Sequence, residues 1–187
     1  MGFLIMLYRD DLESLLIKAF IPIGYKLTTA VQVDVIPESA NYNALSFSLN
    51  NNKIIYRKAK LTETRPGAFL TLWKRPKALS ANTNKPIPYD VSELDYLFVD
   101  VEEGPLRRGI FIFPVALLVN KGIVRSDKSK GKTAFRVFPA WSRDRGVSGT
   151  QVFSESAKKT QQWQLPYFVQ CHDSEIDADL LVGILAS

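Results

Sequence analysis

Lysine and arginine are concentrated in one part of this sequence, where their side chains could bind a polyanion. The stretch from Lys53 to Lys77 holds eight of these bases and one acid, so it carries +7, whereas the whole 187-residue chain carries +5. Within the stretch, Trp73 is followed directly by Lys74 and Arg75. Cations beside flat aromatic rings suit phosphate contacts combined with base stacking. The stretch therefore predicts an anionic partner.

Other charges are also clustered along the chain. Residues 121–145 hold eight bases and two acids, and Lys158 and Lys159 precede Trp163 by five and four residues on a predicted helix. Residues 90–103, by contrast, hold six acids and no base. We therefore expect a positive and a negative side of the molecule, with residues 90–103 on the surface turned away from the ligand.

Within that acidic run, Asp100 and Glu102 are two residues apart, so on a strand they would share a face and could form a metal pair. The alternative is an exposed strand face opposite the apolar residues Leu97, Val99 and Val101. We favour the exposed face, because that alternation is typical of a half-buried strand.

The composition excludes several classes of chemistry. The chain has one histidine, His172, and no G-x-S-x-G motif, which disfavours zinc, acid–base and serine-hydrolase sites that depend on histidine. Neither a Walker-type nor a G-x-G-x-x-G phosphate loop is present. A lone cysteine, Cys171, cannot form an internal disulfide, and no secretory signal or membrane-length apolar run is found. These features predict a cytoplasmic protein without a membrane partner.

Hydrophobic patterns predict about six strands and three or four helices, mixed in order along the chain. Residues 10–20 have helical spacing with acids in the first turn, and residues 155–165 predict a second helix. The clearest local signal is a β-hairpin over residues 44–61, with its turn at Asn50 to Asn52. The sequence thus predicts an α/β fold in which residues 1–187 form a single domain, a mixed β-sheet core with flanking helices.

In the second strand of this hairpin, alternation places Tyr56, Lys58 and Lys60 on one face and Arg57 on the other. Two lysines therefore share a face of the predicted sheet.

Four motifs occur in a fixed order: NYNALSF with IIYRKAKLTETRPGAFLTLWKR, then GIFIFP, KGKTAFRVFPAW and AKKTQQWQLPYF. The pattern, from about residue 35 to about residue 170, resembles the bacterial MepB-like family. The resemblance implies a restriction-endonuclease-like, PD-(D/E)XK core that binds nucleic acid, with nuclease activity not expected to be preserved.

A PD-(D/E)XK site needs an acid at the edge of one strand and an acid or amide two residues before a lysine on the next, so that carboxylates hold Mg²⁺. On this alignment Lys60 matches the lysine, but Lys58 stands where a metal ligand is required. Asn43 stands where the strand-edge acid is required, and the nearby carboxylates are Glu38 and Asp34. A cation repels Mg²⁺, so we interpret the site as degenerate, with its positive charge free to face phosphate.

The leading hypothesis is a non-catalytic nucleic-acid-binding protein without a cofactor or a bound metal. DNA is favoured over RNA, and binding is expected to be weakly sequence-selective and strongly salt-dependent. The predicted contacts are the cations and neighbouring tryptophans of the basic segments, namely Arg57, Lys58, Lys60, Lys74, Arg75, Lys77, Arg136, Lys158, Lys159, Trp73 and Trp163.

Two alternatives remain. The first is a Mg²⁺-dependent nuclease that uses Lys60 with Glu38 or Asp34. The second is a binding module for an anionic small molecule or protein.

Overall fold

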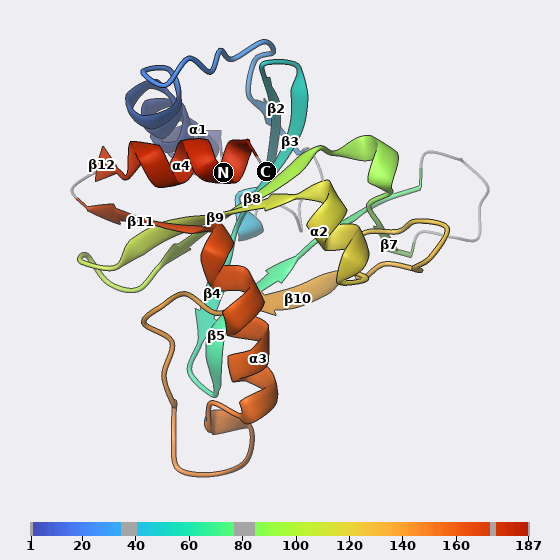
Figure 1. The fold of residues 1–187 in the computed structure, drawn as a ribbon, viewed down its shortest axis with the longest axis vertical. Helices are drawn as coiled ribbons and strands as arrows, with labels where there is room; N and C mark the ends of the chain where they lie inside the picture. The colour runs from blue at the N-terminus through green and yellow to red at the C-terminus, as the bar shows by residue number, and fades with distance from the viewer. Residues whose placement is uncertain (1, 35–40, 77–84, 173–174, 187) are drawn as a thin grey trace.

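In a computed structural model, which describes residues 2–34, 41–76, 85–172 and 175–186, the chain is built on a mixed seven-stranded sheet. The strands lie in the order β1-β2-β3-β8-β9-β11-β12 (Figure 1). Their bounds are β1 Gln32–Val33, β2 Leu45–Leu49, β3 Asn52–Lys58, β8 Tyr96–Glu102, β9 Arg108–Pro114, β11 Phe168–His172 and β12 Glu175–Ile176. Only β3 and β8 pair in parallel, and the other neighbours are antiparallel. The mixed sheet and its helices confirm the predicted α/β class.

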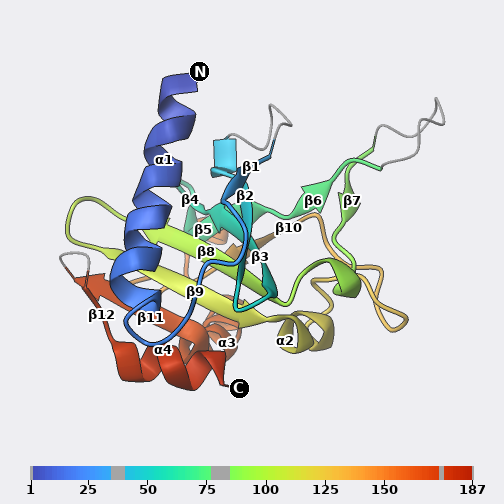
Figure 2. The same ribbon diagram turned by 90° about the horizontal axis from the view of Figure 1, so that it is seen from above.

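One face of this sheet is covered by helices from the two ends of the described chain (Figures 1 and 2). Helix α1, Gly2–Leu15, continues into a π-helical turn, Leu16–Phe20, and α4 spans Ala178–Leu185. Their buried side chains, such as Leu16, Phe20 and Leu181, pack on Phe98 and neighbouring strand residues in one apolar cluster. None of the helices in the described ranges is both long and apolar enough to cross a bilayer.

A smaller sheet and two further helices cover the opposite face. The smaller sheet has the order β10-β5-β4, with β4 Lys60–Thr62, β5 Arg65–Thr71 and β10 Ala134–Val137. Helix α2 spans Val115–Asn120, α3 spans Glu155–Gln164, and a two-stranded ribbon joins β6 Trp73–Lys74 to β7 Ile87–Pro88. Apolar residues from these elements and from the main sheet form a second buried cluster. The main sheet is thus buried on both faces.

The predicted hairpin is confirmed as β2 and β3, which pair antiparallel from Leu45↔Tyr56 to Leu49↔Asn52. Its second strand is shorter than predicted: β3 ends at Lys58, and Lys60 begins β4 of the smaller sheet, so the two lysines do not share a face of one strand. Its two turn residues, Asn50 and Asn51, have φ values of 47° and 68°. Two consecutive positive φ angles make the tight turn that matches strand twist, and asparagine tolerates this conformation better than most residues. The local sequence therefore sets the register of the hairpin.

Helix α1 differs from its prediction. It begins at Gly2 instead of residue 10, so Asp10 and Asp11 lie within the helix and not in its first turn. The preceding segment, FLIMLYR, contains good helix formers and neither Gly nor Pro, and this allows the helix to extend toward the N-terminus.

Candidate functional site

A cleft of about 600 Å³ lies where β3 leaves the main sheet and the chain enters β4. The hairpin register places the residues just before β2 beside the end of β3, so Asn43 comes close to Lys58. Between the two lysines, Ala59 is buried and its backbone N–H donates to the Asp100 carbonyl at 2.8 Å. The lining residues are Asn41, Asn43, Lys58, Ala59, Lys60, Leu61, Glu102 and Gly104.

The charges in this cleft are two ammonium groups and one carboxylate. The Lys58 Nζ lies 2.6 Å from the Glu102 carboxylate oxygen, and both side chains are partly exposed. Lys60 is exposed, and its Nζ lies 5.4 Å from the centroid of the Tyr42 ring. No ion pair of Lys60 with a described carboxylate is found. The cleft is therefore positive overall.

These residues do not fit a Mg²⁺ site. Among the described residues, Glu102 is the one carboxylate that lines the cleft, and it is already paired with an ammonium group. Asp34 lies 3.9 Å from the Arg57 guanidinium and is not among the lining residues, while Glu38 lies outside the described residues. Across the described ranges, no three His, Cys, Asp or Glu side chains gather as they would around a metal. Magnesium requires several oxygen ligands without a competing cation.

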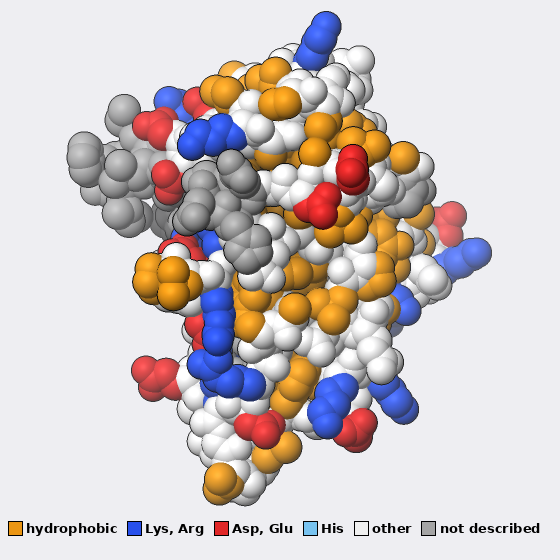
Figure 3. Space-filling view, turned by 60° about the vertical axis from the view of Figure 1, so that its left-hand side comes forward, with side chains coloured by type: hydrophobic (Ala, Val, Ile, Leu, Met, Phe, Trp, Pro, Cys, Tyr) orange, Lys and Arg blue, Asp and Glu red, His pale blue; other side chains and the backbone are white. Residues whose placement is uncertain are grey.

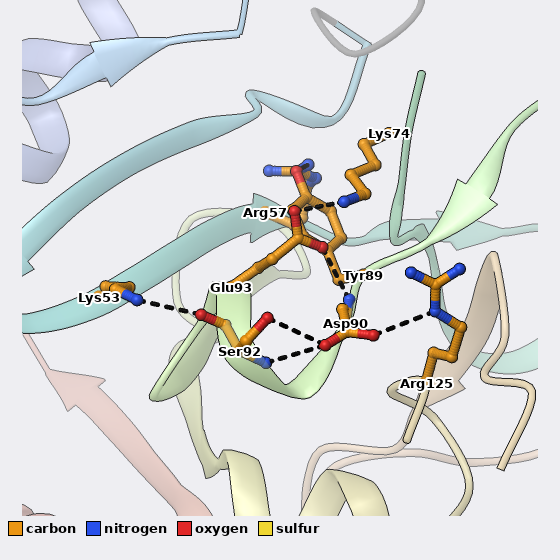
Figure 4. A network of polar contacts seen from close by, with 8 residues as sticks. All are labelled: Lys53, Arg57, Lys74, Tyr89, Asp90, Ser92, Glu93 and Arg125. Atoms are coloured by element: carbon orange, nitrogen blue, oxygen red, sulfur yellow. Dashed lines mark hydrogen bonds and ion pairs between the residues drawn. The ribbon is translucent and has the colours of Figure 1, made fainter. Parts of the chain in front are cut away.

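The prediction that Arg57 contacts phosphate is wrong, because its side chain is only 3% exposed. Its guanidinium donates to the Tyr56 carbonyl at 2.8 Å and to the Tyr89 hydroxyl at 3.0 Å. Figure 4 shows Arg57 and Tyr89 within one polar network. Strand β3 lies between β2 and β8 with both faces covered, so alternation gives it no exposed face. Arg57 stabilises the interior.

Lys74 belongs to the same polar network, where its ammonium group pairs with the Glu93 carboxylate (Figure 4). Glu93 also accepts from the Asp90 backbone N–H, and Asp90 pairs with Arg125 at 3.1 Å. Lys74 is thus neutralised within the protein.

The other predicted contacts on the ribbon are Arg75, Trp73 and Lys77. The Arg75 guanidinium lies 4.9 Å from the centroid of the half-buried Trp73 ring. Lys77 lies outside the described residues.

On helix α3, Lys158 pairs with Glu155 at 2.8 Å, and Lys159 is exposed. Trp163 packs against the second apolar cluster, with its ring 5.8 Å from that of Phe113, and the Lys121 ammonium group lies 5.3 Å from its ring centroid. The ring is half-buried, and it already contacts the core on one side and a cation of this protein.

Arg136 lies on the outer face of the smaller sheet. Its guanidinium donates to the carbonyls of Pro66 and Gly67 at 3.0 and 3.1 Å and to the Thr62 hydroxyl at 2.6 Å. Burial lowers its pKa, and repulsion from Arg65 and Arg145 lowers it further. No described carboxylate forms an ion pair with it.

The expected exposure of Asp100 is wrong, since only 3% of its side chain is exposed. Its carboxylate accepts from the Tyr56 hydroxyl at 2.9 Å and from Arg108 at 3.1 Å. Burial, reinforced by the Asp100 charge, raises the pKa of Tyr56 well above its usual value. Asp100 and Glu102 are therefore held by protein groups and do not form a metal pair.

The expected division into a positive and a negative side is also wrong. Most of the acidic run pairs with the two basic segments: Asp90 with Arg125, Glu93 with Lys74, Glu102 with Lys58, and Glu103 with Arg143 and Arg145. Asp100 pairs with Arg108, and Glu103 also pairs with Arg107, both of which follow the run directly. On the face drawn in Figure 3, basic side chains accordingly lie among acidic ones, beside a hydrophobic area. Acidic and basic segments that are separate in the sequence are therefore adjacent in the folded chain.

Sequence reasoning missed two aromatic neighbours of Lys60, namely Tyr42 and Phe69. Their rings meet edge to face with centroids 6.3 Å apart. A signal was present, because alternation in FLTLWK places Phe69 and Thr71 opposite the apolar Leu70 and Leu72.

Comparisons with known proteins match the part of the chain that holds the four sequence motifs. The MepB-like family model matches residues 37–170. The crystal structure of MepB is 34% identical, with a TM-score of 0.61 over 75% of this chain and 86% of that chain. A bacterial homing endonuclease is 17% identical over 67% of this chain and 77% of its own, with a TM-score of 0.35. The chain matches no curated protein sequence. The family model covers most of the chain, and the chain therefore belongs to the MepB-like family.

Proposed function

We propose that this protein binds nucleic acid without cutting it, through the cleft at the end of β3. The observation that carries the proposal is the meeting of Asn43, Lys58 and Lys60 in one cleft. A PD-(D/E)XK nuclease places carboxylates at the first two of these positions to hold Mg²⁺. Here an amide and an ammonium group replace them.

Electrostatics supports a phosphate ligand at this cleft. Glu102 offsets one of the two lysines, so one positive charge, that of Lys60, remains without a described acidic partner. A phosphate oxygen can accept hydrogen bonds from both ammonium groups. These bonds are stronger than those that a neutral carbonyl or hydroxyl oxygen would accept, because both partners are charged. Such contacts release counterions from a polynucleotide, so affinity should fall steeply with salt.

A salt titration tests the proposal. Fluorescence anisotropy of labelled single- and double-stranded DNA and RNA, from about 20 to 300 mM KCl, gives the slope of log K against log salt. The double variant Lys58→Glu, Lys60→Glu should weaken binding and flatten this slope by about 2.

A matched control is the double variant Lys128→Glu, Lys130→Glu. Both lysines are exposed in the loop that precedes β10, and the change in net charge is the same. Equal losses in the two double variants would mean that net charge, and not the cleft, governs binding. If neither strand type binds the wild-type protein at low salt, the proposal is wrong.

Incubation with supercoiled plasmid and Mg²⁺ or Mn²⁺ tests the nuclease alternative on the same preparations. We expect no nicking above the background of the Lys60→Ala variant. Nicking by the wild-type protein that Lys60→Ala abolishes would overturn the non-catalytic assignment.

A further inference from the structure

A row of cation, aromatic ring and cation crosses the outer face of the smaller sheet. Lys60 on β4 and Arg136 on β10 are both direct register partners of Phe69 on β5. Residues directly opposite on neighbouring strands point to the same side of a sheet. The three side chains therefore share one face of the smaller sheet, whose strands β4 and β5 lie in the lower half of Figure 1.

Burial shows which face this is. The adjacent row, Leu61, Ala68 and Val137, packs toward the main sheet within the second apolar cluster. Phe69 belongs to neither apolar cluster and is only half-buried. Its ring thus lies on the side turned away from the main sheet.

The row is compact, because its members are held by direct contacts. The Arg136 guanidinium lies 6.0 Å from the Phe69 ring centroid, and the Tyr42 ring, which Lys60 also contacts, lies against Phe69 at a steep angle. Three hydrogen bonds to Pro66, Gly67 and Thr62 fix the guanidinium in place. The site is therefore organised before any ligand arrives.

The positive charge of the row lacks acidic partners. Lys60, Arg65 and Arg136 form no ion pair with any described carboxylate, in contrast to Lys58, Lys74 and Arg108. Arg65 and Arg136 also line one cleft at the start of β5. An anionic ligand would relieve the repulsion between these cations.

Lys60 also lines the cleft at the end of β3, so the two features are continuous. We propose that the row binds unpaired bases of a single-stranded nucleic acid. Phe69 and Tyr42 stack with bases, while Lys60 and Arg136 contact the phosphates on either side. This inference rests on the proposed function and names the form of its ligand.

Geometry favours a single strand over a duplex. Neighbouring strands of a sheet lie about 4.8 Å apart, so Lys60 and Arg136 are separated by roughly 10 Å at their backbones. One ring between two cations at this spacing suits a base flanked by its own phosphates. In a duplex both faces of each base are already stacked on neighbouring bases, so no base face is free to stack on the ring of Phe69.

The experiment compares three ligands of equal length: a single-stranded oligonucleotide of mixed sequence, an abasic oligonucleotide with the same phosphates, and a duplex. The proteins are the wild type, Phe69→Leu and Phe69→Tyr, with melting temperatures recorded to confirm folding. Leucine keeps apolar volume at the position but removes the flat ring, and tyrosine restores the ring.

We expect the wild type to bind the strand with bases more tightly than the abasic strand. Phe69→Leu should lose roughly 5- to 150-fold in affinity for the strand with bases, the range found for one base–aromatic stack. Affinity for the abasic strand and the duplex should change less than twofold, and Phe69→Tyr should bind as the wild type does.

Failure of this inference is distinguishable from failure of the proposed function. If all three ligands bind, respond to Lys58→Glu, Lys60→Glu and ignore Phe69→Leu, the cleft binds phosphates but the row does not stack bases. If none of the ligands binds at low salt, the proposed function itself is wrong, and this inference falls with it.

Discussion

The Lys58 ammonium group and the Glu102 carboxylate lie 2.6 Å apart, at the mouth of the cleft proposed to bind phosphate. Forty-four residues separate them in the chain, and the parallel pairing of β3 with β8 brings them together. The pair sets how much positive charge the cleft offers to a ligand.

Neutralising the carboxylate should therefore strengthen binding. In Glu102→Gln, Lys58 loses its ionic partner and can contact a phosphate, so affinity should rise about two- to fivefold, the range of an exposed ion pair. The slope of log K against log salt should steepen by about 1. Fluorescence anisotropy across a salt series measures both quantities.

Glu13→Gln is the control for this variant, because it also removes one carboxylate, which pairs with Arg9 on α1. We expect it to leave the slope unchanged. Weaker binding by Glu102→Gln would contradict the role assigned to the pair and would indicate that the carboxylate itself contacts the ligand.

Arg57 and Lys60 should give opposite results when each is replaced by methionine. Arg57→Met leaves the Tyr56 carbonyl and the Tyr89 hydroxyl without their donor, so the free energy of unfolding should fall by about 1–3 kcal/mol. Its salt slope for nucleic acid should not change. Lys60→Met should change stability by less than about 0.5 kcal/mol while it weakens binding.

Urea denaturation and anisotropy on the same preparations test this crossover. A stable Arg57→Met variant with a flatter salt slope would show that Arg57 reaches the ligand despite its burial.

The buried carboxylate of Asp100 depends on Arg108. Removing one partner of a fully buried ion pair costs about 3–5 kcal/mol, and Arg108 is one-third exposed, so Arg108→Ala should lose about 2–3 kcal/mol. For a domain of this size, the loss corresponds to a fall in melting temperature of roughly 4–12 °C.

Arg107→Ala is the matched control, since its partner Glu103 is also bound by Arg145. It should stay within about 0.5 kcal/mol of the wild type. Equal stability of the two variants would contradict the dependence of Asp100 on Arg108.

The thiol of Cys171 should be unreactive in the folded protein. Burial, reinforced by the nearby Asp100 charge, raises its pKa to about 11, and Arg108 opposes the rise. At pH 8 the folded thiol is protonated, so a disulfide reagent such as DTNB should react far more slowly with the native protein than with protein in urea.

The same shift predicts a dependence of stability on pH. The unfolded thiol has a pKa of about 8.5, so the stability that this group contributes is complete below that pH and is lost as the pH rises toward 11. Tyr56 also titrates at high pH, so the difference between wild type and Cys171→Ala isolates the thiol. A constant difference from pH 7 to pH 11 would contradict the shift.

Several features could be predicted from the sequence because they depend on neighbouring residues. Asn50 and Asn51 form the tight turn, Pro114 precedes α2, alternating apolar residues define β2, and nearly continuous apolar runs define β8 and β9. The motifs of the MepB-like family also pointed to Asn43, Lys58 and Lys60 as one site: the hairpin register, which follows from its turn, brings Asn43 beside Lys58, and Lys60 comes two residues later at the start of β4.

Whether a charged side chain is buried, paired or exposed, by contrast, depends on packing between segments that are distant in the sequence. A period of two predicts an exposed face only when one face of a strand is free, and β3 and β8 are covered on both. Arg57 and Asp100 are buried for that reason, and most carboxylates of residues 90–103 find a base from another segment. The row of Lys60, Phe69 and Arg136 likewise requires the pairing of β4 and β10 with β5, and β10 is more than sixty residues away in the chain.

By itself, then, the sequence determined the fold class, the family, the hairpin and the meeting of two lysines beside an asparagine. Only the tertiary structure decided which cations stay unpaired and which aromatic rings lie beside them. The physical reason is that strand propensity and turn geometry act over a few residues, whereas burial and ion pairing depend on whichever segments the completed sheets bring into contact.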